Sequence, residues 1–232
     1  MLSPLSRRRF LSRSLQVAGT ALAGSAFAQP FASGKESVNQ QALAICDPHL
    51  HLWDLSKFKL PWLGGEAVQR INRSFVMKDY LEASSGHKLE KAVYMEVNVA
   101  PDMQVAEAEY VIDLCQRDDN PMVGAVIGGS PQSVDFKKYA KKFGENEHVK
   151  GVRTVLHDAD RPTGMCLTPQ FVENIQLLGK LGKRFDLCMR PDELLDGARL
   201  ADKCPKTNFV VDHCGNLSVQ NKDAALRAKW EK

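Results

Sequence analysis

Two histidines, His49 and His51, are the residues whose type and spacing most suggest chemistry; they lie in the segment ICDPHLHLWD (residues 45–54). The apolar run at this point predicts a strand, and side chains two residues apart in a strand point to the same face. Two imidazoles on one face can bind one divalent cation, typically zinc, at about 2.0–2.1 Å. Because His-x-His also occurs by chance, the alternative is a pair of hydrogen-bonded loop residues.

A third histidine occupies an equivalent place. His213 follows the apolar run of NFVVDHCG (residues 208–215), so we expect it at the carboxyl end of another strand. Three histidines at strand ends would supply most of a catalytic metal site, with a water as the remaining ligand. Asp212 is expected on the opposite side of its strand, where it either orients a neighbouring ligand or forms a helix cap or surface ion pair.

Further polar residues end two other predicted strands. His157 ends the strand 149–157, with Arg153 four residues earlier on the same face, and Arg190 ends the strand 184–190. An arginine at the mouth of a site can bind a substrate carboxylate through two parallel hydrogen bonds. We therefore predict all three as residues of a catalytic site. The alternative for both arginines is an ion pair at the rim of the sheet.

One carboxylate and two aromatic residues are predicted to contact a substrate. Glu96 interrupts the apolar run VYMEVNV (residues 93–99), where a carboxylate is costly unless it is paired, so it belongs either to the site or to a buried polar network. Trp53 and Trp62 lie in the long connection after the first strand. Long connections in compact domains are often functional lids, although both rings could simply pack over the end of the sheet.

Alternating strands and helices must position these residues. The strand patterns cover residues 43–52, 91–99, 122–129, 149–157, 184–190 and 208–215, and the helix patterns cover residues 74–84, 104–117, 134–143, 168–182, 191–203 and 224–232. Six βα units in succession predict a parallel sheet covered by helices. No Gly-x-Gly-x-x-Gly loop follows the first strand, which disfavours a doubly wound dinucleotide-binding sheet.

The remaining architecture is a (β/α)₈ barrel of the TIM type. Such barrels have eight units and about 250 residues, whereas this chain offers only about six units. We predict that residues 45–232 form a barrel domain that is incomplete at its C-terminus, because the last helix pattern has no C-cap glycine. Residues 29–44 are predicted to be a linker.

The first 28 residues are predicted to be a twin-arginine signal peptide. Arg7 and Arg8 form the arginine pair, an apolar segment covers residues 15–27, and the small-residue sequence AFA precedes Gln29. The apolar segment is too short and too rich in Gly, Ala and Ser for a stable membrane anchor. We expect the twin-arginine export machinery to carry the folded protein to the periplasm or otherwise out of the cytosol, a route that often carries metalloproteins.

Charge and cysteine content narrow the class further. The predicted signal peptide holds four arginines and no acidic residue, which leaves 27 basic residues against 28 acidic ones. A balanced chain without a basic stripe does not suggest nucleic acid as a partner. The six cysteines contain no C-x-x-C motif, and folding in a reducing cytosol before export favours free thiols over disulfides.

Four segments together carry a family resemblance: DPHLHLWDLSKFKLPWL (47–63), GVRTVLHD (151–158), FDLCMRPDELLDGARLADKCP (185–205) and NFVVDHCGN (208–216). They resemble the amidohydrolase-related proteins of the lactonase-like branch, which includes sugar-acid and pyrone-dicarboxylate lactonases. The resemblance implies a (β/α)₈ barrel that hydrolyses a lactone or a related cyclic ester or amide. His49 and His51 match the family's His-x-His of strand one, and His213 matches its strand-six histidine.

The resemblance also implies a mechanism. A divalent metal, expected to be zinc, would bind His49 and His51. His213 would be a third ligand or would donate a hydrogen bond to the developing oxyanion. Arg153 or Arg190 would bind the carboxylate of a small-molecule substrate. The family's general base is an aspartate of strand eight, which has no match in this sequence, so we expect little or no activity from residues 1–232.

Several alternatives stay open. The strand-four bridging residue and the strand-five histidine of two-metal members have no match either, so the site is expected to be mononuclear, and some relatives work without metal. The alternative functions are a barrel decarboxylase of the same superfamily and an inactive truncated remnant.

Overall fold

The computed structural model describes residues 43–231 of the chain. The predicted signal peptide and the predicted linker up to residue 42 lie outside the described residues, so both stay predictions. No helix in the described part of the chain is long and apolar enough to cross a membrane.

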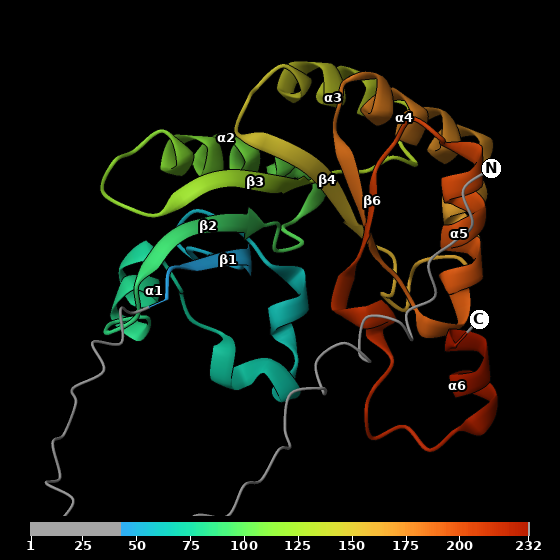
Figure 1. Cartoon of the computed structure of the whole chain (residues 1–232), viewed down its shortest axis with the longest axis horizontal. Helices are drawn as coiled ribbons and strands as arrows, with labels where there is room; N and C mark the ends of the chain where they lie inside the picture. The colour runs from blue at the N-terminus through green and yellow to red at the C-terminus, as the bar shows by residue number, and fades with distance from the viewer. Residues whose placement is uncertain (1–42, 232) are drawn as a thin grey trace, which may run out of the picture. The chain divides into compact units, whose positions relative to one another are not determined.

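Six parallel strands form one curved sheet whose spatial order equals their order in the sequence. The strands are β1 (Ile45–Leu50), β2 (Leu89–Met95), β3 (Met122–Gly128), β4 (Val149–Val155), β5 (Arg184–Cys188) and β6 (Phe209–Val211). β1 and β6 form the two edges of the described sheet, and Figure 1 shows the strands curling as part of a barrel. The prediction of a (β/α)₈-type fold with six units is confirmed.

Helices follow the strands and cover the outer face of the sheet. They are α1 (Met77–Ala83), α2 (Gln104–Cys115), α3 (Phe136–Gly144), α4 (Pro169–Lys180), α5 (Leu194–Lys203) and α6 (Ala224–Trp230). Helices α2 to α5 lie along the outer side of the curved sheet (Figure 1). The long connection after β1 contains two short 3-10 helices, η3 (Pro61–Gly64) and η4 (Glu66–Ile71).

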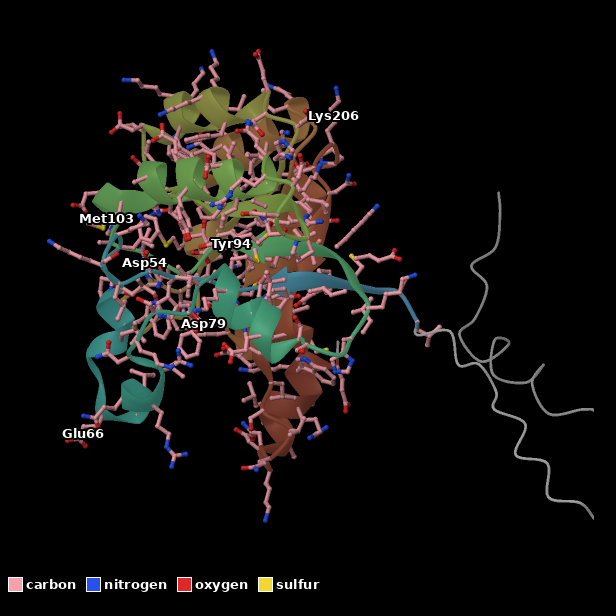
Figure 2. All side chains as sticks on the ribbon, turned by 90° about the vertical axis from the view of Figure 1, so that its left-hand side faces the viewer. Asp54, Glu66, Asp79, Tyr94, Met103 and Lys206 are labelled. Atoms are coloured by element: carbon pink, nitrogen blue, oxygen red, sulfur yellow. The ribbon has the colours of Figure 1, made fainter. Side chains whose placement is uncertain are left out.

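The core lies between the sheet and these helices. Its large, almost fully buried side chains include Tyr94, Phe136, Phe171, Phe185 and Leu200. Figure 2 shows Tyr94 in the middle of the packed side chains, whereas Glu66 and Lys206 lie at the surface. Burial of an aromatic or aliphatic side chain of this size stabilises the fold by roughly 1.5–3 kcal/mol, so this layer fixes the strand ends that carry the polar residues.

All six strands end earlier than their apolar patterns predict, so His157 and Arg190 follow β4 and β5 instead of ending them, and β2 and β6 differ most, by four residues each. β2 stops at Met95 because the Glu96 side chain and carbonyl accept bonds from Asn98 and Arg153 instead of continuing the strand. β6 stops at Val211, so Asp212 and His213 lie in a turn after the strand and not on it. After β2 the apolar pattern continues because Val97 and Val99 are buried, whereas after β6 both His213 and Cys214 are exposed.

Candidate functional site

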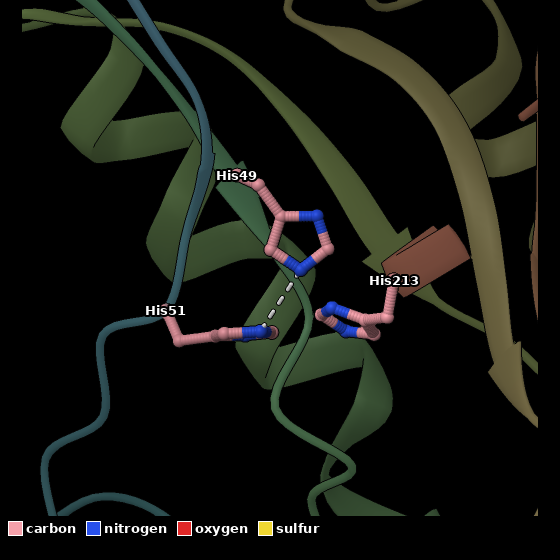
Figure 3. Close-up of side chains that lie close together, drawn as sticks. All are labelled: His49, His51 and His213. Carbon is pink, nitrogen blue, oxygen red and sulfur yellow. Dashed lines mark hydrogen bonds between the residues drawn. The ribbon is translucent and has the colours of Figure 1, made fainter. Parts of the chain in front are cut away.

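Three imidazoles converge beside the carboxyl ends of the first and last described strands. His49 lies on β1, His51 directly follows it, and His213 lies in the turn after β6. One ring nitrogen from each lies within 4.8 Å of the others. The Nε2 atoms of His49 and His51 are 3.1 Å apart, and the His49 and His213 ring centroids are 4.8 Å apart. Figure 3 shows the three rings facing one another.

The tautomer of His51 follows from its second nitrogen. Its Nδ1 lies 3.0 Å from the carbonyl oxygen of Met95, which can only accept, so Nδ1 must donate. Its Nε2 is therefore left as a lone-pair donor that faces His49. This is the carbonyl-supported arrangement usual for metal-binding histidines.

The spacing of the rings suits one small cation. Nitrogens that share a zinc ion in tetrahedral geometry, with bonds of about 2.0–2.1 Å, lie about 3.3–3.4 Å apart. The 3.1 Å between the Nε2 atoms of His49 and His51 is close to that separation, and the nearby His213 offers a third nitrogen. The residues present therefore fit a mononuclear metal site with His49, His51 and His213 as ligands.

The protonation state also suits a cation. Burial and, to a smaller extent, the positive charge of Arg153 together lower the pKa of His51 to about 4. Burial lowers the pKa of His49 too, although the Asp212 carboxylate opposes this effect. Both imidazoles are therefore neutral near pH 7, which is the form that binds metal ions.

An unusual backbone turn carries His213. His213, Cys214, Gly215 and Asn216 are consecutive residues with positive φ, at 49°, 51°, 77° and 58°. Left-handed conformations cost non-glycine residues about 1–2 kcal/mol each, so surrounding contacts must hold the turn. The Asn216 side chain donates to the carbonyl of Met189 at 2.9 Å, and an added Cβ at Gly215 would lie 2.6 Å from Leu194.

Helix α6 supplies a further contact to this turn. The Nε1 of Trp230 donates a 2.6 Å hydrogen bond to the carbonyl oxygen of Cys214, the residue next to His213. The bond therefore joins the last described helix to the backbone that aims the third imidazole.

Replacing Trp230 with phenylalanine is expected to weaken zinc binding about fivefold, because it removes one hydrogen bond worth about 1 kcal/mol from the turn that carries His213. Competition titration with a chromophoric chelator would measure the affinity. Trp62→Phe is the matched control, because it removes an equivalent bond to the Val97 carbonyl at 2.8 Å. Equal zinc affinity in wild type and Trp230→Phe would show that α6 does not position His213.

A buried ion network lies beside the histidines. Arg153 on β4 donates from Nε to Glu96 Oε1 at 2.6 Å, from one terminal nitrogen to Asp212 Oδ2 at 3.3 Å, and from the other to the Glu96 carbonyl at 2.7 Å. The side chains are 5%, 3% and 2% exposed, respectively, for Arg153, Glu96 and Asp212. Glu96 thus lies in a buried polar network, one of the two arrangements that the sequence left open for it. Arg153 forms ion pairs that are buried and not at the rim, and Asp212 is a buried ion-pair partner instead of a surface one.

One member of this region, Glu107 on α2, escaped the sequence analysis. Its Oε1 accepts hydrogen bonds from the Tyr94 hydroxyl and the Val97 amide, both at 2.9 Å, whereas its Oε2 has no partner among the described residues. Burial and the nearby Glu96 raise the pKa of Glu107 to about 8. Helical spacing could have found it, since Glu107 lies four residues before the fully buried Val111 on the same helix face.

Arg190 and His157 lie at the more open rim. The Arg190 guanidinium pairs with Glu193 at 2.7 Å and donates to the carbonyls of Asp158 and Arg161, yet its side chain is 25% exposed. His157 is exposed, and its Nδ1 lies 3.4 Å from the sulfur of Cys188 at the end of β5. Arg190 therefore keeps more access to solvent than Arg153.

The two tryptophans pack against each other in the connection after β1. Their rings are 5.7 Å apart in an edge-to-face arrangement. Trp53 is buried and donates to the Arg73 carbonyl, and Trp62 is half-buried and donates to the Val97 carbonyl. Both indole N–H groups are thus engaged, and any substrate contact would use the ring faces. All six cysteines are free thiols, as the sequence predicts.

Similarity to known proteins covers nearly all of this barrel region. A family model described as amidohydrolase matches residues 46–231. An uncharacterized protein of Sinorhizobium fredii, y4mH, is 23% identical over 192 residues, which cover 75% of this chain and 63% of that protein. The chain therefore spans less than two thirds of this relative's length.

Solved structures show the same fold. An amidohydrolase 2 from Bifidobacterium longum subsp. infantis is 26% identical with a TM-score of 0.58, over 81% of this chain and 67% of its own. A zinc-bound amidohydrolase from Burkholderia multivorans is 17% identical with a TM-score of 0.65, over 80% and 62%. A probable 2-pyrone-4,6-dicarboxylic acid hydrolase from Acinetobacter baumannii with bound citric acid is 12% identical with a TM-score of 0.60, over 80% and 64%.

Proposed function

Because the chain belongs to the amidohydrolase family, we propose that it is a hydrolase that opens a lactone, or a related cyclic ester or amide, by attack of an activated water. The observation that carries the proposal is the convergence of His49, His51 and His213 at one point. The lactone class is supported by the resemblance of the sequence and by the similar folds of two proteins described as a probable and a putative 2-pyrone-4,6-dicarboxylic acid hydrolase.

The proposed cofactor is a single divalent cation, zinc, held by His49, His51 and His213. When bound, such a cation supplies Lewis-acid polarisation of a substrate carbonyl group and of water. The zinc found in the Burkholderia multivorans structure supports this choice of metal. The hydrogen bond from His51 Nδ1 to the Met95 carbonyl keeps its Nε2 aimed at the position proposed for the cation.

The proposed substrate carries a carboxylate, and Arg190 is the residue best suited to bind it. Three contacts to protein groups leave two of its five N–H donors available at a half-buried position. Arg153 is proposed to be a positioning residue that does not contact the substrate, because its buried guanidinium holds Glu96 and Asp212 beside the imidazoles. The citric acid bound to the Acinetobacter baumannii protein supports a carboxylate ligand.

The proton of the attacking water needs an acceptor. The resemblance assigns this role to an aspartate of strand eight, which has no counterpart among the described residues. Among the described residues, His157 at the same rim is the alternative proton acceptor, because it is an exposed imidazole. We therefore expect the chain to bind metal and carboxylate fully but to turn over slowly.

The double variant His49→Ala/His51→Ala is expected to abolish zinc binding, because it removes two of three proposed ligands. Elemental analysis after gel filtration should find about one zinc per wild-type chain and none in the variant. Lactone opening, followed by acid release over long incubations, should be slow in the wild type and undetectable in the variant.

His87→Ala/His148→Ala is the matched control, since both histidines lie outside the cluster. Carbon dioxide release is measured in parallel, because a 2,6-dihydroxybenzoate decarboxylase from Rhizobium has a similar fold at a TM-score of 0.53. Release of carbon dioxide without lactone opening would favour the decarboxylase alternative. A wild type that retains no zinc and opens lactones no faster than the double variant would contradict the proposal.

A further inference from the structure

A second group of potential ligands shares His213 with the first. Cys188, Asp212 and His213 each place one donor atom within 4.8 Å of the others. Cys188 ends β5 and is 2% exposed, so its sulfur is buried from the solvent. A thiolate, a carboxylate and an imidazole form a donor set typical of zinc and of softer divalent cations.

A fourth donor lies beside this group. The Nδ1 of His157 is 3.4 Å from the sulfur of Cys188, although His157 itself is exposed at the rim. The cluster thus combines sulfur, oxygen and two imidazoles contributed by the ends of β4, β5 and β6. Four donors of these types match the number that a tetrahedral site requires.

We propose that Cys188, Asp212, His213 and His157 form a second cation position. Soft divalent cations such as cadmium bind there more tightly than at the position formed by His49, His51 and His213. This inference deepens the proposed function, since His213 belongs to both positions. Sulfur ligands favour soft cations, whereas imidazoles suit zinc, so the identity of the cation decides which position it occupies. Binding releases the thiol proton of Cys188 to solvent as the sulfur–metal bond forms.

The buried network prepares Asp212 for this role. Arg153 donates to its Oδ2 at 3.3 Å, which leaves Oδ1 as the oxygen available to a cation. The positive charge of Arg153 is already balanced by Glu96 at 2.6 Å, so Asp212 keeps its negative charge available for the cation. Asp212 and His213 are neighbours in the sequence, and with His213 in the left-handed turn both side chains reach the cluster.

Cadmium titration followed by ultraviolet absorption tests this proposal, because a sulfur–cadmium bond produces a charge-transfer band that nitrogen and oxygen ligands do not produce. Two exposed thiols, Cys46 and Cys214, could bind cadmium on their own, so the reference protein carries Cys46→Ser/Cys214→Ser. The reference is expected to show one saturable band. Adding Cys188→Ser or Cys188→Ala should remove the band, whereas Cys166→Ser, at another buried thiol, should leave it intact.

The two metal proposals fail separately in this design. Adding His49→Ala/His51→Ala should remove zinc retention but keep the cadmium band, because those histidines belong only to the first position. A band that survives both Cys188 substitutions, or that never forms in a folded reference protein, would overturn the second position without affecting the first. A cooperative thermal unfolding transition, measured for each variant, shows that the variant is folded.

Discussion

Replacing Arg153 with methionine is expected to lower the free energy of unfolding by about 3–5 kcal/mol, because it leaves the buried carboxylates of Glu96 and Asp212 without their shared cation. Methionine keeps the length and apolar stem of arginine, so the loss reports charge and hydrogen bonding more than packing. The effect approaches half of the stability of a typical domain. Urea unfolding followed by circular dichroism would measure it.

The matched control is Arg199→Met on α5. Arg199 also bonds to an aspartate, Asp196 at 2.8 Å, but its side chain is 65% exposed. Exposed ion pairs contribute at most about 1 kcal/mol, so this variant should remain close to wild type. If the two variants had equal stability, the buried network would not be what holds the strand ends together.

A double-mutant cycle separates the interaction between Arg153 and Glu96 from the effect of each substitution alone. Glu96→Gln in the Arg153→Met background removes one of the two stranded charges, so the second substitution should cost less there than in the wild type. Coupling of about 0.5–3 kcal/mol is expected for residues in one buried network. Strictly additive losses would indicate that the 2.6 Å contact between Arg153 and Glu96 contributes little.

The order and type of the strands could be predicted from the sequence because each strand is a local apolar pattern. The alternation of Leu50 and Leu52 with His49 and His51 was sufficient to place both imidazoles on one side, and the structure has both leucines buried. The alternation of side chains along a strand depends only on neighbouring residues, so it can be predicted without knowledge of the tertiary fold.

The surroundings of Arg153 and the turn at His213 could not be predicted in the same way. Arg153 contacts Glu96 and Asp212, which are 57 and 59 residues away in the sequence, so its role depends on strands that only the complete sheet brings together. The left-handed turn depends on contacts from Asn216 and Trp230 to distant backbone carbonyls. Propensity disfavours such a turn, and tertiary contacts impose it.

Replacing Glu107 with glutamine is expected to flatten the dependence of stability on pH between about pH 4.5 and pH 8. Burial and Glu96 raise the pKa of Glu107 from 4.5 to about 8. Below pH 4.5 the carboxyl group is protonated in both the folded and the unfolded chain. Between the two values the unfolded chain loses this proton while the folded chain keeps it, so the free energy of unfolding falls as pH rises.

The size of the effect follows from the same linkage. Each pH unit inside the interval lowers stability by up to about 1.4 kcal/mol, which amounts to a few kcal/mol across it. Glutamine resembles the protonated acid in shape, is uncharged, and carries an N–H donor where the acid carries an O–H donor, so it should retain the high stability of the acidic side at pH 8. An added Cβ at Gly128 would lie 3.1 Å from Glu107 Oε2 and 3.4 Å from Glu96 Oε2, so both carboxylates face the same spot.

Other titratable groups face Glu107 and must cancel in the comparison. They are Tyr94 on β2, Glu96 after it, Arg153 on β4 and Tyr139 on α3, and all are unchanged in the variant. Glu109→Gln, on the exposed side of the same helix, is the matched control and should keep the wild-type slope. Urea midpoints at half-unit steps of pH would show the outcome, and parallel curves for wild type and Glu107→Gln would mean that Glu107 is already ionised in the folded protein at neutral pH.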